Sequence, residues 1–89
     1  MSQPFEHHIP RLHSLPVTLP RDRAVQLELE EGVLVFRVSE TVQDRIEALL
    51  HKQRSDSLTL DEAYELQQYE DLDDYLSFVN RLVRSLAQV

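Results

Sequence analysis

The fold is decided by the stretch VQLELEEGVLVFRV, residues 25–38, in which apolar and polar side chains alternate around the pair Glu31–Gly32. A period of two is typical of β-strands, and β-branched residues are frequent in the second half. A one-residue slip would mix the two faces of the sheet, so the register is well specified. The sequence therefore predicts a β-hairpin over residues 24–38 with a two-residue turn. Its register places six apolar side chains on one face: Val25, Leu27, Leu29, Leu34, Phe36 and Val38.

The second face of this hairpin carries Val33 and Val35 among polar residues, which leaves apolar surface without cover. Two strands alone are marginal in water. We therefore expect either that the N-terminal segment covers this face, or that a second chain pairs with the hairpin edge.

Two amphipathic helices are expected after the hairpin. Ser39 suits the N-cap of a helix over residues 40–53, and Thr59 with Glu62 forms a capping box that opens a second helix over residues 60–87. The apolar residues of the second helix recur three and four positions apart, which forms one stripe. They are Tyr69, Leu72, Leu76, Val79, Val83 and Leu86.

The second helix would be about 40 Å long, and the first helix could cover only about half of it. Either the chain bends near Asp71–Asp74, or the excess apolar surface packs on another molecule. A core of this size is also near the lower limit of stability, so we expect a dimer or a partner complex. The expected oligomer interface consists of Val33, Val35, Leu76, Val79 and Val83.

Residues 1–23 contain all four prolines and three of the four histidines. Prolines spaced about five residues apart prevent a useful helix, so we expect an extended or disordered tail before a single small α+β domain over residues 24–89. The histidines His7, His8 and His13 are no convincing metal site, because Pro10 breaks the local geometry and no carboxylate partner is evident.

The composition excludes most enzyme classes. The chain has no cysteine and a single glycine, Gly32, so cysteine nucleophiles, thiolate metal sites and glycine-rich phosphate loops are excluded. We expect no catalytic residues, no metal and no cofactor. No apolar run approaches the roughly 20 residues of a membrane span, and we expect a cytoplasmic protein.

The charge is strongly acidic, with a formal net charge of −7. Residues 61–74 contain seven acidic and no basic side chains. Such a band repels a phosphate backbone, so nucleic-acid binding by the free protein is not expected. An alternative function is a dimer that binds DNA phosphates through Arg11, Arg21 and Arg23. The acidic charge of residues 24–89 opposes this function.

Three stretches resemble a group of small bacterial proteins that is common in cyanobacterial genomes. The stretches are SETVQDRIEALL at 39–50, LTLDEAYEL at 58–66 and YEDL at 69–72, and the group has the pattern VQxRLxxLL…LTxxExxELxxYExL before a terminal helix. The resemblance covers roughly residues 39–85. Members are described as uncharacterised or as antitoxin-like components beside ribonuclease toxins of PIN type.

The resemblance implies a non-catalytic protein-interaction module that binds a basic partner, such as a PIN-type toxin, through its acidic C-terminal helix. An acidic amphipathic helix can cover a basic groove by charge complementarity and apolar anchoring. The alternative function is a stand-alone homodimeric adaptor or assembly subunit. The expected partner-binding residues are Glu65, Tyr69, Glu70, Leu72, Asp73, Tyr75 and Phe78.

Overall fold

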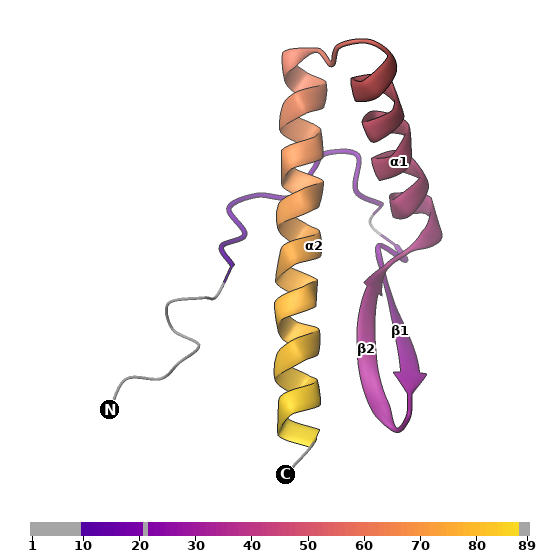
Figure 1. Cartoon of the computed structure of the whole chain (residues 1–89), viewed down its shortest axis with the longest axis vertical. Helices are drawn as coiled ribbons and strands as arrows, with labels where there is room; N and C mark the ends of the chain where they lie inside the picture. Colours follow the sequence, from indigo (N-terminus) through magenta and orange to yellow (C-terminus); the bar gives the residue numbers. More distant parts are fainter. Residues whose placement is uncertain (1–9, 21, 88–89) are drawn as a thin grey trace, which may run out of the picture.

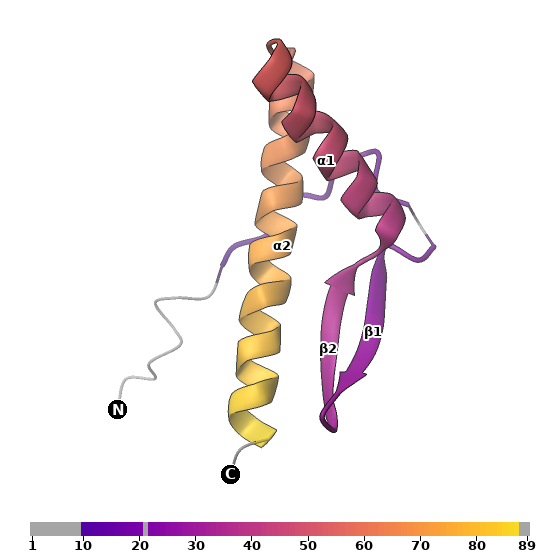
Figure 2. The same ribbon diagram turned by 45° about the vertical axis from the view of Figure 1, so that its right-hand side comes forward.

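The structure is a computed structural model that describes residues 10–20 and 22–87. An antiparallel β-hairpin precedes two helices, which confirms the expected α+β fold (Figure 1). The elements are β1 (Val25–Glu30), β2 (Val33–Val38), α1 (Glu40–Ser55) and α2 (Leu60–Ala87). Figures 1 and 2 show that α1 lies beside the first half of α2 and that the hairpin lies along the second half.

The predicted hairpin register is confirmed. Val25 pairs with Val38, Leu27 with Phe36 and Leu29 with Leu34. The turn residues Glu31 and Gly32 have φ angles of 53° and 81°. Positive φ at both central residues matches a type I′ turn, whose twist suits two adjacent strands.

The hairpin differs from expectation in which side is covered. Val35 is only 6% exposed and Val33 is half-buried, whereas Leu27 and Leu29 on the opposite face are 62% and 70% exposed. The reason is that α2 is the element against which β2 packs, and it approaches from the side of Val35 and Arg37. The expectation that Val33 and Val35 form the uncovered apolar face was therefore wrong.

The side chain of Asn80 on α2 completes the outer edge of β2. Its Oδ1 accepts a hydrogen bond from the backbone N–H of Phe36, and its Nδ2 donates to the Phe36 carbonyl, both at 2.8 Å. An amide side chain thus takes the place of a third strand at this position and satisfies two backbone groups that the hairpin leaves free.

The helix signals in the sequence are also present in the structure. The Ser39 hydroxyl accepts from the backbone N–H of Val42, and Thr59 and Glu62 form the reciprocal capping box. Helix α1 continues to Ser55, two residues beyond its predicted end, and the Ser55 hydroxyl donates to the His51 carbonyl. Helix α2 runs through residues 71–74 as a single helix, without a break at this position.

The main core lies between α1 and the first half of α2. Its buried residues are Val42, Leu49, Leu66 and Tyr69, and Leu19 from the N-terminal segment packs against them. The described part of that segment, residues 10–20, crosses α2 without forming a helix or strand (Figures 1 and 2). The rest of the predicted tail, residues 1–9 with Arg21, lies outside the described residues.

Removing the Asn80 side chain should detach β2 from α2. Asn80→Ala leaves the Phe36 N–H and carbonyl without their partners, which we expect to lower the free energy of unfolding by about 1–3 kcal/mol. Urea denaturation monitored by circular dichroism measures this change. The control Ser85→Ala, at an exposed position of the same helix, should stay within about 0.5 kcal/mol of wild type. Equal stability of both variants would contradict a stabilising role for the Asn80 contact with Phe36.

Candidate protein-interaction surface

The acidic side chains of residues 61–74 have different environments. Glu65 is buried, Glu62 and Asp71 are half-buried, and four acids are exposed: Asp61, Glu70, Asp73 and Asp74. Some acids of this stretch therefore serve the internal structure, whereas the exposed ones are accessible to a partner. Glu62 and Glu65 form ion pairs within the chain, whereas the four exposed acids form none with the described residues.

Glu65 joins three segments of the chain. The Arg45 guanidinium on α1 donates two hydrogen bonds to its carboxylate, each 2.8 Å long. The Thr18 hydroxyl from the N-terminal segment donates a third, and the hydroxyls of Thr18 and Tyr69 lie 2.8 Å apart. Hydrogen bonding from Arg45 lowers the pKa of Glu65, although burial acts in the opposite direction. The carboxylate is therefore ionised and fully engaged within the chain.

A second ion pair closes the turn between the helices. Lys52 Nζ lies 2.8 Å from one carboxylate oxygen of Glu62 and 2.9 Å from the other. Its hydrogen bond, together with the backbone N–H of Thr59, lowers the pKa of Glu62 to about 2. Arg45 and Lys52 are thus used inside the helical hairpin, and neither neutralises the exposed acids.

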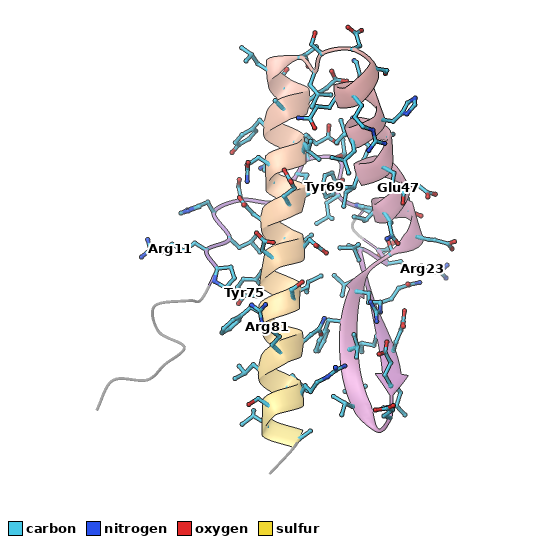
Figure 3. All side chains as sticks on the ribbon, viewed as in Figure 1. Arg11, Arg23, Glu47, Tyr69, Tyr75 and Arg81 are labelled. Carbon is cyan, nitrogen blue, oxygen red and sulfur yellow. The ribbon has the colours of Figure 1, made fainter. Side chains whose placement is uncertain are left out.

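A groove of about 480 Å³ runs between α1 and α2. Its apolar floor includes Val38, Ile46, Leu50 and Tyr69. Its walls carry four acids and two glutamines but no basic residue: Gln43 and Glu47 from α1, and Gln67, Glu70, Asp73 and Asp74 from α2. Figure 3 shows Glu47 and Tyr69 at the same level of the two helices. No ion pair within the described residues involves the four acids.

The structure places the seven predicted partner-binding residues in two environments. Glu70 and Asp73 are exposed on the groove, and Tyr75 is half-buried. The other four are buried in the chain itself: Glu65, Tyr69, Leu72 and Phe78. Only the first three therefore present substantial surface to a partner.

The predicted oligomer residues are also divided. Val33 and Val35 pack toward α2, whereas Leu76, Val79 and Val83 are half-buried on α2. The contributions of α1 to the groove were missed, as was the role of Asn80. The polar positions Gln43 and Glu47 of α1 carry no sequence signal that sets them apart from other solvated helix residues.

The histidine and serine residues show no catalytic arrangement within residues 10–20 and 22–87. Ser55 donates to the His51 carbonyl rather than to the imidazole, and His13 is exposed. Among the described residues, no group of three or more His, Asp or Glu side chains is placed to hold a metal ion. His7 and His8 lie outside the described residues.

A search of the described helices finds none that combines the length and apolar character needed to cross a membrane. No protein-family model matches the chain, and no curated protein or solved structure matches it significantly.

Neutralising Glu65 should destabilise the fold in a pH-dependent manner. Glu65→Gln keeps the shape but loses the charge-assisted bonds to Arg45, so we expect a loss of about 1–3 kcal/mol at pH 7. The pKa of Glu65 is lowered in the fold, so its stabilisation is complete above the ordinary pKa of 4.5 and is lost as the pH falls through the lowered value. The difference between wild type and variant should therefore shrink as the pH is lowered below 4.5.

The measurement is urea denaturation of both proteins across pH 2 to 7. Glu70→Gln is the matched control, because Glu70 is an exposed acid of the same helix, and its stability should stay within about 0.5 kcal/mol of wild type. A cost of Glu65→Gln that does not change with pH would contradict the assignment of the ion pair.

Proposed function

We propose that this protein is a non-catalytic interaction module whose groove between α1 and α2 binds a basic, amphipathic segment of a partner protein. One observation supports this proposal most directly. Among the residues that the structure describes, four carboxylates without an ion pair surround an apolar floor, while the nearby cations Arg45 and Lys52 are already engaged. A surface of this composition favours a segment that combines apolar side chains with Lys or Arg.

The shape of the groove favours a helix or an extended strand over a small ligand. It is open and lies between two helices, which is the arrangement that an amphipathic helix uses when it packs into a groove. The carboxylates would steer the basic segment toward the groove, and the apolar floor would supply most of the binding free energy. Tyr69 is already buried and acts as part of the floor rather than as a projecting anchor.

The resemblance to antitoxin-like proteins is compatible with this mode of binding. An antitoxin of this kind neutralises a ribonuclease by covering its basic RNA-binding surface, and a PIN-type toxin is the partner that the resemblance suggests. In this chain such a contact would use Glu70, Asp73 and Asp74 of α2 with Glu47 of α1. The buried Glu65 would hold the two helices in place without contacting the partner.

The test compares two charge-matched variants of the full chain. Glu70→Lys/Asp73→Lys reverses two groove acids, whereas Asp22→Lys/Asp44→Lys reverses two exposed acids outside the groove. Tagged wild type, immobilised in native lysate at low salt, should retain one stoichiometric basic protein. The groove variant should retain at least tenfold less of this protein than wild type, and the control variant should retain as much as wild type.

Raising the salt concentration should weaken the complex, because electrostatic steering is screened. Equal loss in both variants would show general charge attraction, and full capture by the groove variant would overturn the proposed site. Circular dichroism of each variant establishes that the fold is intact.

A further inference from the structure

The outer face of the hairpin is an apolar surface that the described residues leave uncovered. Four of its side chains are between 39% and 70% exposed, and we call them the leucine face: Val25, Leu27, Leu29 and Leu34. No charged residue belongs to this face, because the charged partners Glu28, Glu30 and Arg37 pair with one another on the opposite side of the sheet. The leucine face therefore offers nothing that would favour a basic partner.

The half of α2 that runs along the hairpin has a polar and an apolar side. Asn80 faces the edge of β2, and it separates two sides of the helix. On one side, Ser77, Arg81 and Arg84 line a hollow with Val35 and Arg37. On the other side of the helix, spacing places Leu76, Val79, Val83 and Leu86 along one stripe. Leu76 lines a second hollow together with Phe36, Glu28 and Arg37. Figure 3 marks Arg81, which belongs to the polar side.

The leucine face is one contiguous apolar patch. The four side chains of the leucine face lie next to one another on the two paired strands, and a contiguous exposed apolar patch often marks an interaction site.

The free edge of β1 coincides with the leucine face. The Ser39 N–H donates to the Ala24 carbonyl, so Ala24 points its carbonyl toward β2, and the next residue of an antiparallel strand points its backbone groups away. The outward N–H and carbonyl groups of β1 therefore belong to Val25, Leu27 and Leu29. The corresponding edge of β2 is closed by Asn80, whereas no described residue closes that of β1.

We propose that the free edges of β1 from two copies of this chain pair antiparallel about a two-fold axis at Leu27. In this register Leu27 lies opposite the partner's Leu27, and Val25 lies opposite the partner's Leu29. Residues opposite each other in a ladder share a face, so the two leucine faces form one side of a four-stranded sheet. The outward backbone groups of both strands are then satisfied.

Charge selects this register among its neighbours. The polar face places Gln26 opposite the partner's Glu28, and it brings Arg23 to the same end of the ladder as the partner's Glu31. If the strands shifted toward the turn, so that Leu27 lay opposite the partner's Leu29, Glu28 would lie opposite the partner's Glu28. Two like charges opposite each other are unfavourable. A shift in the other direction would place Leu29 opposite Arg23 and lose an apolar pair. The strand is thus self-complementary in one arrangement.

The test uses single cysteines, because the natural chain has none. Residues paired across an antiparallel ladder have Cα atoms about 5.5 Å apart, within the range of a disulfide. Leu27→Cys should therefore form a covalent dimer under mild oxidation, seen on a non-reducing gel. Leu34→Cys is the matched control: it is 48% exposed on the same face but lies on β2, away from the axis, and should stay largely uncrosslinked.

Light scattering gives the second measurement. Wild type should have about twice the chain mass of 10.4 kDa, and Leu27→Lys, which places two like charges at the axis, should have the single-chain mass. Leu60→Lys, at a 90% exposed position outside the surface, should remain dimeric. A wild-type mass of 10.4 kDa at high protein concentration would overturn the proposal. Equal crosslinking at positions 27 and 34 would overturn pairing of the β1 edges, because it would indicate that the two leucine faces pack against each other.

Discussion

The length of α2 is the constraint on which the rest of the structure depends. It has 28 residues, whereas α1 has 16, so α1 can cover only the first half. The second half is covered by the hairpin, which reaches α2 with the edge of β2. One polar side chain of α2 fixes each half: Glu65 holds α1 and the N-terminal segment, and Asn80 holds the hairpin. Both are buried or half-buried, and the described residues contain no buried side-chain nitrogen or oxygen without a hydrogen bond.

This arrangement leaves two surfaces of opposite character. The groove between the helices is acidic, because the nearby cations are used to join α1 to α2 rather than to neutralise its walls. The leucine face is uncharged, because the charged residues of the two strands lie on the opposite face. It is also uncovered, because α2 packs against the edge of β2 and the side of Val35. The proposed partner and the proposed second copy thus use separate parts of the chain, and binding at one does not require the other to be vacant.

The hairpin register, the turn, both helices and their caps could be predicted from the sequence, because each depends on neighbouring residues. The side of the hairpin that packs on α2 could not, since both faces contain apolar residues and the choice depends on where Asn80 meets β2. The sequence likewise shows an acidic band but cannot tell that Glu65 is engaged by Arg45, twenty residues earlier, or by Thr18. Tyr69 and Leu72 belong to a regular apolar stripe, and that stripe is compatible with an internal core and with a docking site alike. Their burial decides for the core.

The most direct test of the claim that the chain leaves surfaces for other molecules is amide hydrogen exchange, followed residue by residue by nuclear magnetic resonance at several protein concentrations. The N–H groups of Gln26 and Glu28 point toward β2 and should be protected at every concentration. Those of Leu27 and Leu29 point outward, and we expect their protection to rise with concentration, because β1 pairs with a second copy. Fast exchange of Leu27 and Leu29 at every concentration would show that the edge of β1 stays unpaired and would contradict this claim.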